Sequence, residues 1–364
     1  MSLSDSKDKL SDWGEFRLID EVVLPVLNPK AAPRVGGDDC AYLPARAGSL
    51  AVTSDVGPRP LVWHLGHESY FTWGWYAVAI NASDIASAGA EPLAFTSSVE
   101  APSSMLVTDF RDFFSGVAAA CGELGFLNAG GNVREAPRFE CHGTGIGSVG
   151  DGPVLRRSGC APGDLIVSVG ECGRFMTAFA HAKANGLSAV SRPEWDLLTA
   201  PKPPLRAMSK LRCSGFVTAA SDNSDGLLGA IWNIAAASKC AVEIDMSDHL
   251  VPFSIREAAM SLGVSPWNLM FCWGDWQVIC AVRAESVEVL NRLAASENVR
   301  IQALGRAVAG PPSVYGCRSG RCAPLNVIRN ESFTSASFNR GIETQLEFML
   351  KSPLFRTEGH SRQS

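Results

Sequence analysis

Residues 73–89 read WGWYAVAINASDIASAG, a run of apolar and small side chains that ends at Gly89, with Pro92 shortly after it. Glycine and proline at such positions are a stop signal, so the run predicts a helix that finishes near Gly89. Asn81 and Asp84 are three positions apart and therefore project from the same face of this helix. The stretch predicts a helix that presents an amide and a carboxylate side by side.

Strand-like and helical segments alternate on both sides of this helix. Residues 49–54 (SLAVTS) have the composition of a short strand, and Asp55 follows them. Apolar spacing predicts a helix over 110–124 capped by Gly125, a strand over Leu165–Val169, and helices over 175–184 and 226–238. Polar residues 221–225 (SDNSD) precede the last helix, and we expect their oxygens to cap its N-terminus. The alternation indicates an α/β fold.

The glycine-rich segment 143–152 (GTGIGSVGDG) resembles the GxGxxG spacing of dinucleotide-binding loops only weakly. Pro153 and two arginines follow it in place of a helix, and the GK[ST] ending of a P-loop is missing. We therefore interpret the segment as a strand that leads to a domain boundary. A chain of 364 residues is long for one core, so we expect domains at 14–152 and 153–335 and a tail at 336–364.

Composition and charge narrow the classes of partner. The chain is 46% hydrophobic and 19% charged, which is typical of a globular protein, and its net charge is −5. A negative chain does not attract nucleic acid or an anionic membrane, so we expect neither partner and expect anionic ligands to be held locally. The polar N-terminus does not look like a secretory signal, and no apolar run approaches the roughly 20 residues of a membrane span. The sequence predicts a cytoplasmic protein.

Eleven cysteines are spread along the chain without a CxxC pair. An odd number without framework spacing predicts reduced thiols. Cys317 and Cys322 are the closest pair, and no second pair or histidine accompanies them, so we expect no zinc site there.

Aspartates recur at the ends of apolar segments. They are Asp38, Asp39, Asp55, Asp84, Asp222 and Asp225. A single aspartate beside a turn is ordinarily a cap or an Asx-turn residue. Several together favour a different interpretation, because Mg²⁺ is a hard cation that binds carboxylate and phosphate oxygens. An acidic protein that binds a triphosphate needs such ions to offset charge repulsion.

Six motifs, in order along the chain, resemble those of the thiamine-monophosphate kinases, members of the aminoimidazole ribonucleotide synthetase superfamily. GEFRLI at 14–19 is similar to their GEFxLI, GDDCA at 37–41 to GDDxA, and TSD at 53–55 to (S/T)TD. NASDIA at 81–86, with Gly89 and Pro92, resembles NLSDIAAMGxxP. LRRSG at 155–159 with PGD at 162–164 resembles LxRSGAxPGD, and SDNSDGL at 221–227 resembles IDxSDGL. The similarity extends from about residue 14 to 278, some three quarters of the chain.

This resemblance implies roles for particular residues. The implied Mg²⁺ ligands are Asp38, Asp39, Thr53, Ser54, Asp55, Asp84, Asp222 and Asp225. The implied contacts to ATP are Asn81, Gly131, Ser224 and Arg157, the last to the polyphosphate. The resemblance also implies a two-domain, PurM-like α/β fold, in which the N-terminal domain binds ATP and forms a homodimer through its sheet, with the active site in a cleft between the domains. The implied chemistry is in-line phosphoryl transfer from Mg-ATP to a small molecule, which requires no protein nucleophile.

The chain departs from the family pattern mainly on the acceptor side. The GGD metal motif is Gly130-Gly131-Asn132, and Asn132 keeps an oxygen ligand but loses a full charge. The GGEDYE segment is CWGDWQ at 272–277, which leaves Asp275 and Trp276 as candidate acceptor-binding residues. The loop after the TSD motif is GPRP at 57–60, followed by Trp63 and His64, which are either acceptor-binding residues or ordinary surface and core residues. Tryptophan faces at 63, 273 and 276 could stack on a planar ring or cation.

Three functional hypotheses follow. The first is an ATP-dependent phosphotransferase that resembles thiamine-monophosphate kinase and accepts that substrate or a related one. The second is the activation of an amide or carboxylate oxygen by ATP, after which phosphate is expelled. The third is a catalytically weakened ATP-binding partner subunit, which the change to Asn132 suggests and the retained aspartates oppose.

Overall fold

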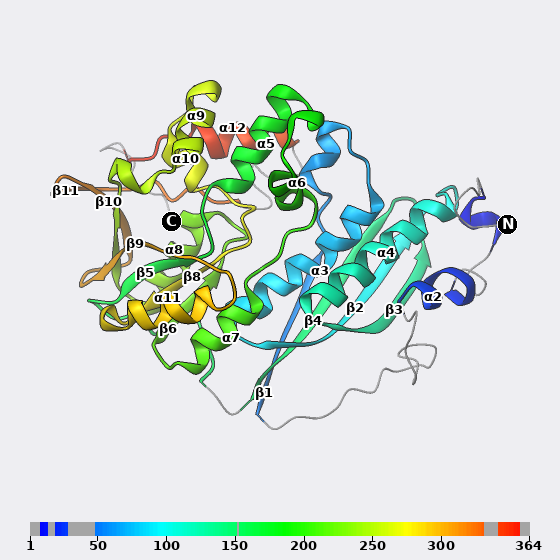
Figure 1. Ribbon diagram of the computed structural model, residues 1–364, viewed down its shortest axis with the longest axis horizontal. Helices are drawn as coiled ribbons and strands as arrows, with labels where there is room; N and C mark the ends of the chain where they lie inside the picture. The colour runs from blue at the N-terminus through cyan, green and yellow to red at the C-terminus, as the bar shows by residue number, and fades with distance from the viewer. Residues whose placement is uncertain (1–7, 14–18, 28–47, 151–152, 331–340, 357–364) are drawn as a thin grey trace. The chain divides into compact units, whose positions relative to one another are not determined.

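A computed structural model of the chain describes residues 8–13, 19–27, 48–150, 153–330 and 341–356. The chain forms two compact units (Figure 1). Unit 1 takes Met1–Ile85, Ala90–Gly152 and Trp195–Leu205, and unit 2 takes Ala86–Gly89, Pro153–Glu194 and Arg206–Ser364. The two units therefore differ from the expected domains 14–152 and 153–335, because residues 195–205 belong to unit 1. Side chains of unit 1 hold this segment. Trp75 Nε1 donates to the Pro201 carbonyl (2.9 Å), and the Tyr76 hydroxyl donates to the Leu198 carbonyl (2.8 Å).

Unit 1 is a four-stranded sheet with two long helices on one face. Its strands are β1 (Ser49–Val56), β2 (Glu91–Ala101), β3 (Leu127–Glu135) and β4 (Glu140–Gly150), in the order β1-β4-β2-β3. Only the β2–β3 pair is parallel. The helices are α2 (Leu24–Leu27), α3 (Tyr70–Ser87), α4 (Val107–Leu124) and α6 (Arg192–Thr199), which begins in unit 2, with short helices η2 (Leu10–Asp12), η3 (Ile19–Val23) and η4 (Leu61–Leu65). Residues 143–150 of the glycine-rich segment therefore lie in strand β4, as expected, and residues 151–152 lie outside the described part of the chain.

Helices α3 and α4 lie side by side (Figure 1), and two glycines allow them to touch. A Cβ on Gly74 would lie 2.0 Å from the Phe113 carbonyl oxygen, and one on Gly116 would lie 1.9 Å from that of Phe71. The predicted apolar stripe of α4 is buried throughout, including Phe110 and Phe113. Both predicted helices are present, and each begins three residues earlier than predicted, at Tyr70 and at Val107.

Strand β1 lies at the edge of the sheet, and its residues alternate in exposure. Leu50, Val52 and Val56 are 58%, 65% and 57% exposed, whereas Thr53 and Asp55 are partly buried. Successive side chains on a strand point to opposite faces. Thr53 and Asp55 therefore face the helices, and the sheet presents apolar side chains on its open face.

Unit 2 is built on a seven-stranded sheet with the order β11-β10-β7-β9-β5-β8-β6. Its strands are β5 (Leu165–Val169), β6 (Val217–Asp222), β7 (Ala241–Asp245), β8 (Val278–Val282), β9 (Ile301–Val308), β10 (Ser313–Arg318) and β11 (Arg321–Pro324). Its helices are α5 (Arg174–Asn185), α7 (Leu205–Cys213), α8 (Leu227–Ser238), α9 (Phe253–Leu262), α10 (Pro266–Met270), α11 (Val287–Ala295) and α12 (Ile342–Lys351), with η5 (Leu187–Ala189), η6 (Asp248–Leu250) and η7 (Ala284–Ser286). All pairs except β7–β10 are antiparallel. Strand β8, which lies between β5 and the edge strand β6, is buried at every residue, which is typical of a strand covered on both faces.

Two expectations about the C-terminal part are corrected. The predicted tail contains α12, whose Leu346 and Met349 are buried. The Asn268 amide donates to the carbonyls of Met349 (3.2 Å) and Ser352 (3.1 Å), so hydrogen bonds as well as apolar contacts hold this helix on unit 2. The remaining tail residues, 336–340 and 357–364, lie outside the described part of the chain.

The second correction concerns the cysteines. A disulfide joins Cys317 to Cys322, which contradicts the prediction of reduced thiols for this pair. The two residues face each other because β10 and β11 form a hairpin that pairs them directly. Eight other described cysteines are free. None of the described helices combines the length and the apolar character that a membrane span requires.

Candidate functional site

Three oxygen-bearing side chains meet between β1 and α3. The Thr53 hydroxyl lies 2.5 Å from Asp84 Oδ2 and 3.4 Å from Asp55 Oδ2, so one hydroxyl contacts both carboxylates. Asp84 is contributed by the helix and the other two residues by the strand. Residues 31 positions apart in the sequence are thus brought together. Two carboxylates around one hydroxyl concentrate negative charge and oxygen ligands in one place.

Glycines of β4 allow α3 to approach the sheet closely at this point. A Cβ on Gly143 would lie 2.5 Å from the amide nitrogen of Asn81, and one on Gly145 would lie 3.1 Å from the Cβ of Asn81. Asn81 is completely buried, and its amide donates to the Ala77 carbonyl of its own helix (2.9 Å). Asn81 and Asp84 do face the same side, as predicted. However, Asn81 packs beneath the sheet, so the structure gives it a packing contact rather than an exposed surface for nucleotide.

Ser54 is separated from this carboxylate group. Its hydroxyl bonds the Gly143 carbonyl (3.1 Å) and contacts the Thr144 hydroxyl (3.2 Å). Because side chains alternate along a strand, Ser54 lies on the face opposite to Thr53 and Asp55. The structure therefore does not place the Ser54 hydroxyl among the predicted Mg²⁺ ligands.

The GGN motif lies on β3, at the other edge of the sheet. Gly131 pairs with Ser97, and Asn132 pairs with Ser98, on strand β2. Since β4 and β2 separate β1 from β3, three strand spacings of about 4.8 Å place β3 roughly 14 Å from β1. Asn132 is exposed and is not part of the Thr53 group. Asp38 and Asp39 lie outside the described residues.

A second polar group occupies the loop between β6 and α8 in unit 2. Asp222 ends β6 and is only 7% exposed, and its carboxylate accepts the backbone N–H of Ser224 (3.2 Å). Arg157 Nη2 lies 3.9 Å from the other carboxylate oxygen of Asp222. Asp225 is partly buried, and its carbonyl accepts the backbone N–H of Asn330 (2.8 Å). Predicted residues from two motifs, Arg157 and Asp222, are therefore neighbours.

The predicted capping of α8 by these polar side chains is wrong. The N-cap is Gly226, and no side chain accepts a hydrogen bond there. Gly226 has φ 96°, a left-handed conformation that a side chain disfavours. The chain thus turns sharply at glycine before the helix starts, and the carboxylate of Asp222 bonds within its own loop.

Asp275 has a structural role that the sequence does not reveal. Its two carboxylate oxygens accept the backbone N–H groups of Gly173 and Phe175, each at 2.6 Å, at the start of α5. Burial raises the pKa of Asp275 to about 7, although these N–H groups and Arg174 act to lower it. The carboxylate therefore caps a helix from a distant segment, and its role in acceptor binding stays a prediction. Next to it, Trp276 has φ 59°, an uncommon conformation for a large side chain.

The predicted aromatic residues of unit 1 form a platform that the sequence identified only in part. Trp63 makes edge contacts with Tyr70 and Trp73, both with ring centroids 5.3 Å apart. The guanidinium of Arg59 lies over Trp63 at 5.6 Å and over Trp73 at 5.4 Å. His64 is exposed on η4 beside them. The sequence analysis did not predict Arg59 as a site residue. Its position four residues before Trp63, in the GPRPLVW stretch, is the signal that could have indicated this role.

Comparisons with known proteins identify the family to which the chain belongs. The family models for AIR synthase related protein, N-terminal domain and C-terminal domain, match residues 37–149 and 161–316. A thiamine-monophosphate kinase of Mycobacterium tuberculosis is 30% identical over 284 residues, covering 77% of this chain and 84% of that protein. The crystal structure of thiamine-monophosphate kinase from Stenotrophomonas maltophilia K279a matches with a TM-score of 0.66 and 27% identity, over 79% of this chain and 90% of that one. HypE of E. coli, a hydrogenase maturation protein, shares the fold alone, with a TM-score of 0.67 and 18% identity over 86% of this chain and 97% of that one.

Two α/β domains of this kind in this order define an AIR synthase related protein, with the PurM-like fold expected from the motifs. Within that class, the chain belongs to the thiamine-monophosphate kinase family, whose members are ATP-dependent kinases.

Proposed function

We propose that this chain transfers the γ-phosphoryl group of Mg-ATP to thiamine monophosphate or a closely related small phosphate ester. The observation that supports this most directly is the group formed by Thr53, Asp55 and Asp84, in which two carboxylates share one hydroxyl. Oxygen ligands of this kind suit Mg²⁺, and the proximity of two negative charges favours a divalent cation between them and an anionic nucleotide. When bound, Mg²⁺ neutralises phosphate charge and helps to orient the γ-phosphoryl group for in-line displacement.

The residues of the chain act by positioning and by charge. The Thr53 hydroxyl donates to Asp84 and holds that carboxylate beside Asp55, so the oxygen ligands are in place before the nucleotide binds. In unit 2, Arg157 is 57% exposed and is assigned to the polyphosphate, with its guanidinium held near Asp222. Asp222, Ser224 and Asp225 are assigned to Mg²⁺ and nucleotide on the basis of their motif. Because Asn132 lacks the negative charge of the aspartate in the family motif, we expect one Mg²⁺ site to be weakened or lost.

The acceptor is assigned to the platform made by Arg59, Trp63 and Trp73. Arg59 is exposed, and within the described part of the chain its N–H groups have no carboxylate partner, while the two tryptophans hold its guanidinium. A guanidinium held in this way can bind phosphate oxygens with two parallel hydrogen bonds. Arg59 follows Asp55 by four residues, so at most roughly 14 Å of extended chain separates it from the carboxylate group. A phosphate-bearing acceptor with an aromatic ring fits these residues.

We propose that two copies of the chain form a homodimer. The open face of the unit 1 sheet exposes Leu50, Val52 and Val56 along β1, and an exposed apolar row on a sheet is a typical interaction surface. A second copy of the same face would cover these side chains. ATP is a cytoplasmic metabolite, so we place the reaction in the cytoplasm, with no nucleic acid or membrane as partner.

The test is a product assay with purified protein, Mg-ATP and thiamine monophosphate, followed by mass spectrometry. The proposal predicts an acceptor heavier by one phosphoryl group, and predicts that Asp55→Asn and Asp84→Asn each remove this product. Free phosphate with an unmodified acceptor would indicate the activation chemistry of the second hypothesis. Tight Mg-ATP binding without any turnover over a panel of phosphate esters would indicate the partner-subunit hypothesis.

A further inference from the structure

The segment 317–322, CRSGRC, forms a hairpin that places its two cysteines opposite each other. Ser319 (φ 50°) and Gly320 (φ 77°) are both left-handed, as in the two-residue turns that fit the twist of antiparallel strands. The turn fixes the register, so Arg318 pairs with Arg321 and Cys317 with Cys322. The side chains of directly paired residues lie on the same face of the sheet. Both sulfur atoms therefore sit together on one face of unit 2.

The next strand contributes a carboxylate to the same place. Strand β7 runs parallel to β10, with Cys317 paired to Asp245 and Tyr315 paired to Glu243. Glu243 is two residues from Asp245 and hence on the same face as Cys317. A carboxylate oxygen of Glu243 and the sulfur atoms of Cys317 and Cys322 all lie within 4.8 Å of one another. Two cysteines of one hairpin and a glutamate of the neighbouring strand β7 thus present potential metal ligands around one point.

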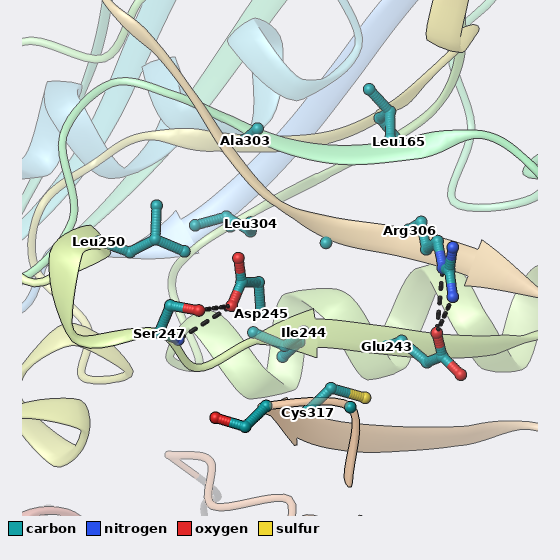
Figure 2. A pocket seen from close by; sticks show the side chains of 13 residues that line it. Leu165, Glu243, Ile244, Asp245, Ser247, Leu250, Ala303, Leu304, Arg306 and Cys317 are labelled. Carbon is teal, nitrogen blue, oxygen red and sulfur yellow. Dashed lines mark hydrogen bonds and ion pairs between the residues drawn. The ribbon is translucent and has the colours of Figure 1, made fainter. Parts of the chain in front are cut away.

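The point lies beside a pocket of about 490 Å³ on unit 2, lined by Glu243, Arg306 and Cys317 among others. Figure 2 shows these three residues on neighbouring strands, with the Arg306 guanidinium turned toward the Glu243 carboxylate. Arg306 Nε and Nη2 donate to the same oxygen, Glu243 Oε2, at 3.0 and 2.9 Å. The other carboxylate oxygen, Oε1, receives neither of these bonds. The pocket gives a cation and a water molecule a route to the ligands.

The charges suit a divalent cation. Two thiolates and one carboxylate carry three negative charges, which a divalent cation reduces to one, and the Arg306 guanidinium offsets the last. Carboxylates that bind metals are usually held by such an outer partner. Thiolate ligands select Zn²⁺ and similar ions over Mg²⁺, which prefers oxygen. The set is therefore chemically distinct from the oxygen group at Thr53.

We propose that Cys317, Cys322 and Glu243 form a redox-controlled binding site for Zn²⁺ or a similar divalent transition-metal ion, with water as the fourth ligand. The site exists only in the dithiol form. A dithiol reductant transfers two electrons and two protons to the Cys317–Cys322 disulfide, which yields two thiols, and the reductant becomes a disulfide. Metal binding then releases the two thiol protons to solvent. This inference is independent of the proposed kinase activity, because it uses none of the nucleotide or acceptor residues.

Cobalt(II) is the probe, because thiolate ligands give it a near-ultraviolet charge-transfer band that oxygen ligands do not give. The full-length protein is reduced with dithiothreitol and desalted under nitrogen, and a thiol titration confirms a gain of two thiols per chain. We expect Co²⁺ to produce the band in the reduced wild-type protein, and Zn²⁺ to displace it. The oxidised protein should lack the band, and Cys322→Ser, which keeps a single thiolate, should give a weaker band and bind Co²⁺ more weakly. Cys213→Ser, which removes an exposed free cysteine elsewhere, is the matched control and should keep it.

Glu243→Gln tests the third ligand without touching the disulfide, so the oxidised variant folds with the hairpin closed. Its reduced form should bind Co²⁺ at least roughly tenfold more weakly than the wild type, and Arg306→Met should bind roughly 10- to 100-fold more weakly. Absence of the band in the reduced wild type would overturn the site. So would equal affinity of the wild type with Cys322→Ser or with Glu243→Gln.

Discussion

The hydroxyl of Thr53 offers a sharp test of how the carboxylates are organised. It has one proton and two acceptors, and the 2.5 Å contact with Asp84 is much shorter than the 3.4 Å contact with Asp55, so the proton goes to Asp84. Thr53→Val keeps the branched shape that suits a strand and removes only this donor. A hydrogen bond to a charged group contributes about 1.5–3 kcal/mol. Loss of an outer partner of a metal ligand typically lowers metal affinity roughly 10- to 100-fold, which is about 1.4–2.8 kcal/mol.

The assay is the Mg²⁺ dependence of ATP turnover, with direct calorimetry of Mg-ATP binding beside it. We expect Thr53→Val to need roughly 10- to 100-fold more Mg²⁺ for half-maximal turnover, and Thr53→Ser to restore most of the loss. Ser54→Ala is the matched control, because Ser54 is the next residue on the same strand but bonds Gly143 and Thr144 on the opposite face. We expect its Mg²⁺ dependence to stay within about twofold of wild type. Equal effects of Thr53→Val and Ser54→Ala would refute the reasoning.

Three further perturbations probe the acceptor, a helix cap and the assembly. Arg59→Ala removes a charge-assisted hydrogen bond and should raise the KM for the phosphate-ester acceptor roughly 10- to 100-fold, while the KM for ATP stays unchanged. Steady-state kinetics measures both constants, and an unchanged acceptor KM would contradict the assignment of the acceptor to Arg59, Trp63 and Trp73. Burial raises the pKa of Asp275 from 3.8 to about 7. Between these two pH values, the folded chain keeps a proton that the unfolded chain has lost. The free energy of unfolding therefore falls as pH rises, by at most about 1.4 kcal/mol per pH unit. Asp275→Asn cannot ionise, so its denaturant unfolding at pH 5 and pH 8 should show a smaller decrease than wild type; identical decreases would argue against the raised pKa. Val52→Asp should lower the molecular mass in light scattering from that of the proposed homodimer to that of a monomer, because a buried unpaired charge is costly, and an unchanged mass would exclude this face.

The sequence supported three kinds of prediction, namely helix bounds, family membership and the roles of single residues, and they differ in how far the sequence alone can support them. The bounds of α3, α4 and α8 follow closely from apolar spacing, because a helix buries one stripe and its period is local. The motifs identified the family, and the comparisons confirm it. Asp275 shows what motif inference leaves out. Its motif position suggested an acceptor ligand, whereas its carboxylate caps α5, about a hundred residues earlier in the chain. Only long-range contacts could reveal that role.

Other features that the sequence analysis did not predict could have been predicted from local sequence patterns. Strand alternation alone places Ser54 opposite to Thr53, and the Ser-Gly pair in CRSGRC is the signature of a tight hairpin that sets the cysteines face to face. Helix α12 lies in a segment whose apolar residues, Ile342, Leu346 and Met349, recur at helical spacing. These features were readable from the sequence.

By itself the sequence determined the class of fold, the principal helices, and the candidate ligands that the motifs identify, since each depends on residues close together in the chain. The tertiary structure decided which of these ligands meet. Thr53, Asp55 and Asp84 meet because α3 packs against β1 where the glycines of β4 leave room. Glu243 meets Cys317 and Cys322 because β7 happens to pair with β10. Strand order and helix packing arise from contacts between distant segments, and local sequence patterns do not encode them.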